Sequence, residues 1–219
     1  MALFPFFIDI TGKKGIIIGG GKHALEKIQK IRPFGAKLIV FSENFISEIQ
    51  LLAQESKDTE NEMVLVQRKF LDSDLELEPY FVIIAGEIQK ENRRIASLCQ
   101  SKKILVNVVD DQPACEFIFP SLIQRGNLSI GISTNGASPA IGVRLKKQVE
   151  ELLPHKTEEI LDWLQSKRPY IMKQISDKKR RFFCFHKLAE ICMEENRILT
   201  EAEFEEFLNA EQTIHTLNT

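Results

Sequence analysis

The sequence has no long apolar run, no excess of positive charge and no paired-cysteine motif, and each absence excludes a class of protein. No apolar stretch approaches the about 20 residues that span a bilayer, so we expect no membrane segment. The formal net charge of −2 gives no global positive field for nucleic acid. The four cysteines show no CxxC spacing and no metal-ligand pattern with the four histidines, so we expect no metal site and a reducing cytoplasmic compartment.

The N-terminal stretch, MALFPFFIDITGKK, lacks the basic region and the small-residue cleavage site of a signal peptide. We expect it to form an opening strand that leads into the first turn. With 219 residues, 43% of them hydrophobic, the chain is large enough for one sizeable core and a smaller second unit. It contains no internal repeat and no low-complexity segment.

A glycine-rich turn between an apolar run and a helical segment organises the first half of the chain. The run at residues 15–18 leads into Gly19-x-Gly21-x-x-Ala24, the spacing of dinucleotide-binding turns. The first glycine allows a tight turn, the second lets a pyrophosphate approach the backbone, and the alanine lets helix and strand pack closely. The helix N-terminus offers free N–H groups to phosphates. The alternative is an ordinary strand-to-helix connection in an α/β fold.

A second strand is predicted at residues 37–41, and an acidic residue follows it. Glu43 lies 22 residues beyond Gly21, near the spacing of the acid that accepts hydrogen bonds from an adenosine ribose. The residues that follow include no nearby Arg or Lys to hold a 2′-phosphate, so NAD is favoured over NADP. Alternatively, Ser42 is a helix N-cap and Glu43 stabilises the first helical turn through the dipole. Both roles are compatible.

Strands and helices alternate up to about residue 113. Helices are expected at residues 24–31, 45–55 and 87–100, strands at 63–67, 81–85 and 104–108, and a polar loop or short helix at 72–78. The run FVIIA at residues 81–85 is apolar throughout, as expected for a strand buried on both faces of a parallel sheet. This alternation predicts a doubly wound α/β domain.

The chain changes character after residue 113. Two strand-like pieces, residues 115–120 and 128–133, are expected to be joined by a helical or irregular link, and a turn follows at Asn135-Gly136. Ser138 and the proline after it begin a helix as N-cap and first residue, and this helix runs toward Leu153. Everything beyond is helical, with a capping box at residues 200–203.

Several motifs in this region occur together in one known family. They are VNVVDDQP at residues 106–113, FIFPS at 117–121, Arg125-Gly126, and STNGASP at 133–139. With the opening FPF and the glycine turn, they make the chain resemble the precorrin-2 dehydrogenase family, of the siroheme-synthase N-terminal type. The resemblance covers residues 3 to about 153, and the helical tail is compatible with it.

The resemblance implies an α/β fold in three parts. Residues 1–113 would form a Rossmann NAD-binding domain, residues 114–153 a central segment through which two chains form an interwoven homodimer, and residues 154–219 a helical C-terminal domain. The implied reaction is NAD-dependent removal of two hydrogens from precorrin-2, which gives sirohydrochlorin on the route to sirohaem. Some members also insert Fe²⁺ into sirohydrochlorin, so a bifunctional enzyme is one alternative. A non-catalytic module that binds NAD or a tetrapyrrole and regulates a partner is another.

The resemblance also implies individual site residues. Asp110 would handle the proton, and the polycarboxylate substrate calls for positive groups and an anion-binding helix N-terminus. The cofactor residues would be Gly19, Gly20, Gly21, Lys22, His23, Ser42, Glu43, Asn44, Gly86 and Asn107. The substrate residues would be Arg125, Thr134, Ser138 and Arg144. The pair Gly86-Glu87 departs from the Thr-Asp that is common in the family, which alters a contact on the nicotinamide side.

The residues alone leave alternatives for several of these positions. A carboxylate just after a strand, at the carboxyl edge of a parallel sheet, is well placed to accept a proton. Asp110-Asp111 is otherwise a polar turn before Pro113. Arg144 is otherwise part of a solvated helix face, and the basic run at residues 178–181 is read as a solvated face in a helical tail rich in Glu.

Overall fold

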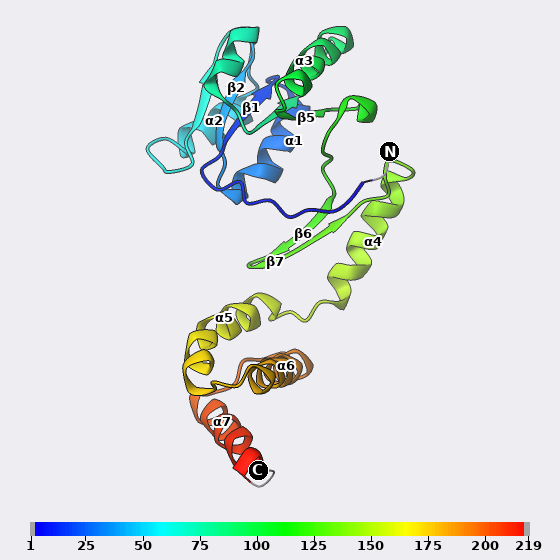
Figure 1. The fold of residues 1–219 in the computed structure, drawn as a ribbon. Helices are drawn as coiled ribbons and strands as arrows, with labels where there is room; N and C mark the ends of the chain where they lie inside the picture. Colours follow the sequence, from blue (N-terminus) through cyan, green and yellow to red (C-terminus); the bar gives the residue numbers. More distant parts are fainter. Residues whose placement is uncertain (1–2, 217–219) are drawn as a thin grey trace. The chain divides into compact units, whose positions relative to one another are not determined.

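The structure is a computed structural model that describes residues 3–216, with side chains described up to residue 210. The chain forms two compact units, Met1–Phe119 and Pro120–Thr219 (Figure 1), and each is described by itself below.

The first unit is a five-stranded parallel sheet with helices on both faces. Its strands are β1 (Lys14–Ile18), β2 (Lys37–Phe41), β3 (Met63–Val66), β4 (Phe81–Ile84) and β5 (Leu105–Val108), in the order β3-β2-β1-β4-β5. The helices are α1 (Lys22–Ile31), α2 (Ser47–Glu55) and α3 (Gln89–Ser101), with 3₁₀ turns η1 (Arg32–Phe34), η2 (Asp72–Leu77) and η3 (Gln112–Ala114). This order is that of a dinucleotide-binding Rossmann sheet.

Alternate residues of the strands face two separate cores, which explains why the strands are largely apolar. Ile16 of β1 packs in the core that α3 covers, together with Ile95 and Cys99 of that helix. Ile17, the next residue, packs in the core that α1 and α2 cover. Both isoleucines are completely buried. The doubly wound α/β domain predicted from the sequence is confirmed.

The opening segment is not the strand that we expected. Residues 3–10 carry no regular secondary structure, and Phe4, Phe6 and Phe7 are each at least 75% exposed. A strand needs a partner for its backbone donors and acceptors, and both edges of β1 are already taken by β2 and β4. The chain instead turns at Gly12, whose N–H donates to the carbonyl of Gly35 at 2.7 Å, and then enters β1.

The stretch from residue 115 to 120 is also not a strand, although it is apolar. It is an irregular segment held beside β5, where Asn107 donates through Nδ2 to the carbonyl of Phe117 at 2.9 Å. Phe117 and Phe119 pack against the core under α1, and the Phe117 ring lies edge-on to that of Phe81. The apolar side chains therefore serve core packing rather than strand pairing.

The second unit begins with a β-hairpin in place of the predicted helical or irregular link. Strands β6 (Ser121–Arg125) and β7 (Leu128–Ile132) pair antiparallel, and only Gly126 and Asn127 lie between them. Gly126 has φ of +52°, a conformation that glycine adopts without strain and that permits this tight turn. Helix α4 (Pro139–Leu152) follows, and Ser138 Oγ accepts from the Ile141 N–H as the predicted N-cap.

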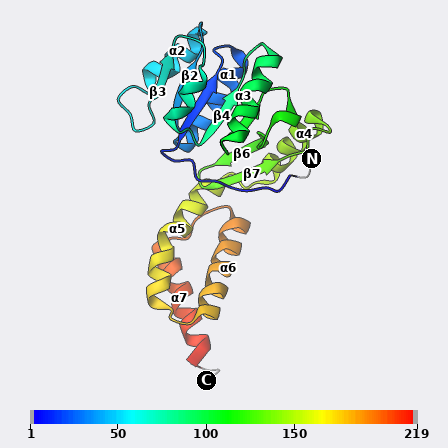
Figure 2. The same ribbon diagram turned by 45° about the horizontal axis from the view of Figure 1, so that its top comes forward.

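Three helices complete the second unit: α5 (Thr157–Gln174), α6 (Lys178–Glu195) and α7 (Glu201–Thr216). They lie next to one another (Figure 2) and share a core that includes Ile160 of α5, Leu188 of α6 and Phe204 of α7. The predicted capping box is present, because Thr200 N–H donates to Glu203 Oε2 at 2.7 Å while Glu203 N–H donates back to Thr200 Oγ1 at 3.3 Å. No helix within residues 3–216 combines the length and apolar character needed to cross a bilayer.

Candidate active site

The strand order reverses direction between β1 and β4, and the loops at their carboxyl ends open a crevice there. In open α/β sheets, ligands bind at such a switch point. The loop after β1 is the glycine turn, and the loop after β4 contains Gly86. The loop after β5, the other neighbour of β4, contains Asp110. Three segments far apart in the sequence thus reach one edge of the sheet.

The three glycines of the turn meet different surroundings. Gly19 has φ of +126°, and a β-carbon there would lie 2.6 Å from the Ala85 carbonyl oxygen. A β-carbon on Gly20 would overlap the carbonyl oxygen of Asn44. Gly21, in contrast, has no atom within 4 Å of the place where its β-carbon would be. The first two glycines are therefore needed for the fold, whereas Gly21 faces open space that a ligand can occupy.

Helix α1 begins at this open space and presents unsatisfied donors to it. Its N-cap, Gly21, has no side chain to accept the first helical N–H groups, and the first turn contains no acidic residue. Lys22 and His23 are exposed in that turn, so a positive charge sits at the positive end of the helix dipole. Such an arrangement is unfavourable by itself and favourable once an anion binds. These residues fit the pyrophosphate of a dinucleotide.

The loop after β2 packs directly on the glycine turn. Ile46 N–H donates to the Gly20 carbonyl at 3.0 Å, and Ser42 Oγ donates to the Asn44 carbonyl at 2.7 Å. Helix α2 starts only at Ser47, so Ser42 is not its N-cap and Glu43 does not lie in its first turn. The Glu43 carboxylate is exposed beside the turn, where a ribose of a bound dinucleotide would lie.

A lysine lies beside Glu43 that the local sequence did not reveal. Lys69 Nζ lies 3.7 Å from Glu43 Oε2. The register of the sheet explains this proximity. Phe41 and Val66, the last residues of β2 and β3, pair with one another. Glu43 and Lys69 follow shortly after these two strand ends. A positive charge is therefore present near the adenosine end of the site, although it comes from the neighbouring strand's loop.

A pocket of about 400 Å³ lies at the carboxyl edge of β4 and β5. Residues from the start of α1, from the ends of both strands and the loops after them, and from the start of α3 line it: His23, Ala85, Gly86, Glu87, Gln89, Asn92, Val108, Val109, Asp110 and Asp111. The pocket thus brings together three of the sequence-predicted site residues, namely His23, Gly86 and Asp110.

Asp110 is exposed in this pocket and has an unusual backbone. Its φ is +60°, in the left-handed region that few residues other than glycine adopt. The residues on either side hold it there, because Val109 N–H donates to the Ile84 carbonyl at 2.9 Å and Asp111 N–H donates to the Val108 carbonyl at 3.3 Å. Strained conformations of this kind are maintained by their surroundings and cluster at functional sites.

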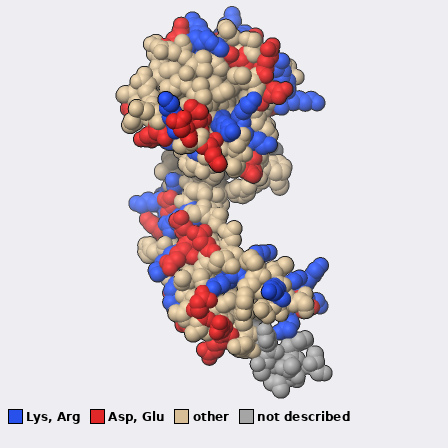
Figure 3. Space-filling model, turned by 90° about the vertical axis from the view of Figure 1, so that its left-hand side faces the viewer, with Lys and Arg blue, Asp and Glu red and all other residues tan. Residues whose placement is uncertain are grey.

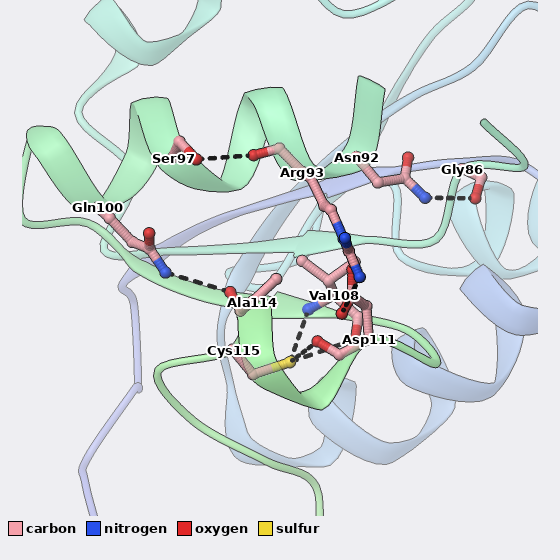
Figure 4. Close-up of polar contacts among 9 residues, drawn as sticks. All are labelled: Gly86, Asn92, Arg93, Ser97, Gln100, Val108, Asp111, Ala114 and Cys115. Carbon is pink, nitrogen blue, oxygen red and sulfur yellow. Dashed lines mark hydrogen bonds and ion pairs between the residues drawn. The ribbon is translucent and has the colours of Figure 1, made fainter. Parts of the chain in front are cut away.

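Asp111 is more than the turn residue that the sequence indicated. Its side chain is only 4% exposed and forms an ion pair with Arg93 of α3. Arg93 donates through Nε to Oδ2 at 2.5 Å and through Nη2 to Oδ1 at 3.2 Å (Figure 4). This bidentate contact raises the pKa of Arg93 above its ordinary value.

Asn107, expected to contact the cofactor, does not line the pocket. Its amide is buried and donates to the Phe117 carbonyl, with the Cys115 sulfur 3.6 Å away. Cys115 Sγ in turn accepts from the Val108 N–H at 3.1 Å. Burial raises the pKa of the Cys115 thiol. Both side chains therefore hold the end of β5 in place and are not available to a ligand.

The four expected substrate residues lie in the second unit, where three of them make structural contacts. Arg125 donates to the carbonyls of Glu150 and Pro154, at 3.2 and 3.4 Å, and so caps the end of α4. Thr134 Oγ1 accepts from the Ser138 N–H at 3.2 Å and donates to the Ser138 carbonyl at 3.1 Å. Ser138 caps the start of the same helix, and Arg144 is exposed on it.

Neither a charged patch of one sign on the face drawn in Figure 3 nor a cluster of metal ligands marks the described side chains. On the face drawn in Figure 3, basic and acidic side chains are interspersed within each unit rather than gathered by sign. Within the described residues, no three or more His, Cys, Asp or Glu side chains come together in a way that could hold a metal ion. All four cysteines are buried thiols.

Residues 6–121 match the protein family described as "Putative NAD(P)-binding". The chain belongs to this NAD(P)-binding family. Its members' nucleotide-binding character agrees with the sheet order and with the open N-terminus of α1. Residues 125–152, which include β7 and α4, match a second family, described as "Sirohaem biosynthesis protein central". The resemblance and the fold class expected from the sequence are confirmed.

Curated relatives of this NAD(P)-binding chain include two proteins named siroheme synthase. The one from Actinobacillus pleuropneumoniae serotype 7 is 32% identical over 185 residues, which cover 84% of this chain and 37% of that protein. The one from Neisseria meningitidis serogroup C is 30% identical, over 82% of this chain and 37% of that protein. The chain thus spans little more than a third of the length of these relatives.

A solved structure titled "SirC, precorrin-2 dehydrogenase" matches 96% of this chain and 100% of its own, with a TM-score of 0.72 and 23% identity. At this identity, the likeness concerns the fold. The fold of the NAD(P)-binding chain, a Rossmann sheet followed by a hairpin and C-terminal helices, is therefore one that a solved structure shares.

Proposed function

We propose that the protein is an NAD-dependent precorrin-2 dehydrogenase that forms sirohydrochlorin in sirohaem biosynthesis. The observation that carries the proposal is one pocket that Asp110 shares with Gly86 of the β4 loop and with His23, which lies in the first turn of α1, directly after the glycine turn. The match of the following segment to the sirohaem central family supports the substrate class, as do the names of the relatives. Four buried free thiols suit a cytoplasmic location.

The residues divide the reaction between them. NAD, when bound, supplies an acceptor for the hydride that leaves the substrate. The accompanying proton needs a base, and the exposed carboxylate of Asp110 at the carboxyl edge of the sheet is placed to accept it and pass it to solvent. Gly19, Gly20 and Gly21 shape the turn for the pyrophosphate, with Lys22 supplying positive charge.

We propose NAD rather than NADP as the cofactor. The exposed carboxylate of Glu43 can accept hydrogen bonds from ribose hydroxyl groups and repels a 2′-phosphate. Lys69 partly offsets that repulsion at 3.7 Å, so the preference is smaller than Glu43 alone would give. Ser42 and Asn44 support this end of the site by holding the loop against Gly20.

We also propose that the protein works as a homodimer. In this arrangement residues 1–113 bind NAD, residues 114–153 form the dimer contacts and residues 154–219 form a helical domain. Two features support it. Helix α4 exposes Ile141, Val143 and Leu145, and the β6–β7 hairpin is a separate two-stranded sheet, a structure with marginal stability by itself. Arg144 on the same helix is the candidate to contact substrate carboxylates. Light scattering at micromolar concentration should give twice the chain mass, and monomer mass alone would contradict the dimer.

The dehydrogenase is tested by incubating the protein with precorrin-2 and NAD while recording absorbance. We expect NADH and sirohydrochlorin to form together. Asp110→Asn should lower the rate by about 10²- to 10⁴-fold, because asparagine keeps the shape and tolerates the left-handed backbone but cannot take a proton. Asp58→Asn is the matched control, since Asp58 is an exposed turn residue with φ of +61° that does not line the pocket.

The outcomes separate the candidate functions. NAD binding with no NADH formed would support the non-catalytic module and overturn the dehydrogenase. Full activity of Asp110→Asn would leave the reaction standing but place the base elsewhere. Fe²⁺ added after the first stage tests the bifunctional enzyme, because metal insertion changes the absorbance of sirohydrochlorin. The bifunctional enzyme is supported only if this change is faster with the protein than in a protein-free control.

A further inference from the structure

We propose that Arg93 is a positioning residue for Asp110, acting through its ion pair with Asp111. Arg93 does not line the pocket, whereas Asp111 and Asp110 do. The inference rests on the proposed function, in which Asp110 is the proton acceptor. Gln89 and Asn92 of α3 line the pocket, and the inference adds to them a residue of the same helix that lies behind it.

The ion pair is the main polar contact of the Asp111 side chain. The Asp111 side chain is 4% exposed, while that of Arg93 is 59% exposed, so the arginine reaches from the surface to a buried carboxylate. A buried carboxylate is costly unless it is paired and hydrogen-bonded. Two hydrogen bonds of 2.5 and 3.2 Å fix both the charge and the direction of the carboxylate. Arg93 therefore determines where Asp111 sits.

The position of Asp111 in turn determines that of Asp110. The Asp111 carbonyl accepts from the Ala114 N–H at 3.0 Å and from Cys115 Sγ at 3.4 Å, so both its backbone and its side chain are anchored. Val109 is anchored to Ile84 on the other side. Asp110 is the residue between the two anchors, and its left-handed backbone persists only while both hold.

The start of α3 holds the opposite wall of the pocket as well. Asn92, the neighbour of Arg93, donates through Nδ2 to the Gly86 carbonyl at 2.7 Å. Figure 4 shows the two side chains leaving adjacent positions of the helix, one toward Gly86 and the other toward Asp111. One helical turn thus sets the spacing between the β4 loop and the β5 loop, which is the width available to the reacting part of a substrate.

The experiment compares Arg93→Met with Arg94→Met in the full chain. Arg94 is the next residue of α3 and pairs with Asp72 and Glu91 at 2.7 and 2.8 Å, but it does not line the pocket. We expect Arg93→Met to lower kcat at least about tenfold, with NAD affinity unchanged within about twofold. Arg93→Lys should recover part of the rate, and Arg94→Met should match wild type.

A second measurement needs no turnover. In carbon-13 NMR spectra recorded at one fixed pH, the carboxyl signals of Asp110 and Asp111 should change position in Arg93→Met and stay unchanged in Arg94→Met. Equal spectra of the two variants at these signals would overturn the positioning role, even if wild-type turnover is normal. A kcat loss that disappears after correction for the folded fraction would overturn it too. Absence of wild-type turnover with displaced Asp110 and Asp111 signals would instead reject the proposed function and keep the Arg93 coupling.

Discussion

The contrast between two neighbouring glycines gives a sharp test of the nucleotide site. Gly21→Ala adds a methyl group to the N-cap of α1, where nothing lies within 4 Å. Its backbone, at φ −97° and ψ −167°, is open to alanine. Alanine at an N-cap lowers the folding stability by about 0.5–1 kcal/mol relative to better caps. Replacing glycine also reduces the conformational freedom of the unfolded chain, which raises the folding stability by about 0.4–1 kcal/mol. The folding stability should therefore change little.

The same methyl group should impair NAD binding. It would occupy the space through which a pyrophosphate reaches the N–H groups of the α1 N-terminus, so at least one charge-assisted hydrogen bond would be lost. Such bonds contribute about 1.5–3 kcal/mol, which corresponds to a rise in the Kd for NAD of roughly 10- to 150-fold. Isothermal titration with NAD measures the affinity, and thermal unfolding measures the stability.

Gly20→Ala is the matched control because it makes the same chemical change one residue earlier. Its β-carbon would overlap the Asn44 carbonyl, so backbone must move and the stability should fall by about 1–3 kcal/mol. The reasoning fails if Gly21→Ala binds NAD like wild type, since a ligand would then not approach the backbone there. It also fails if Gly21→Ala is destabilised as much as Gly20→Ala.

Three further predictions concern single side chains. Lys69→Glu should raise the preference for NAD over NADP by about tenfold, or ~1.4 kcal/mol, because a second carboxylate replaces the cation beside Glu43. Titration with both nucleotides at low salt measures the ratio of the two affinities, and an unchanged ratio would count against a role for Lys69. Arg197 lowers the pKa of Glu203 to about 2, below the value of about 4.3 for an unfolded chain. The ionised Glu203 therefore stabilises the folded protein fully above the unfolded-chain pKa, and this stabilisation is lost as the pH falls to about 2. Glu203→Gln should therefore unfold at lower temperature than wild type at pH 7 but not at pH 2, and a constant difference at both would contradict this. Burial raises the pKa of Cys99 to about 11, so at pH 8 its thiol should react with a thiol reagent about 100-fold more slowly in the native than in the denatured protein, as peptide mapping of the labelled site would show.

Local patterns were enough to predict most of the Rossmann unit. The run at residues 37–41 is β2 with the predicted bounds, and the glycine turn does join β1 to α1. These elements are specified by short-range features: an apolar run, a turn residue with the required φ, and small residues where helix and strand meet. The N-cap at Ser138 and the capping box at residues 200–203 were predictable for the same reason.

What the sequence left open depends on contacts between distant residues. An apolar composition cannot tell a strand from a packed irregular segment, so residues 115–120 were expected to be a strand when Phe117 and Phe119 in fact pack on the α1 core. The pairing of Arg93 with Asp111 spans 18 residues. A signal for it existed, because the helix that follows β4 starts at the carboxyl edge of the sheet, where the residues after β5 also lie.

The position of β1 in the middle of its sheet has a consequence for synthesis of the chain. One neighbour, β2, pairs Lys37 with Lys14, but the other, β4, pairs Phe81 with Gly15. At about 5–20 residues per second, a ribosome needs roughly 3–13 s to add the intervening residues. During that time the second edge of β1 is apolar and unpaired, a surface open to other chains. The nascent protein is therefore most exposed to aggregation before β4 emerges, and slower elongation ahead of Phe81 should lower its soluble yield.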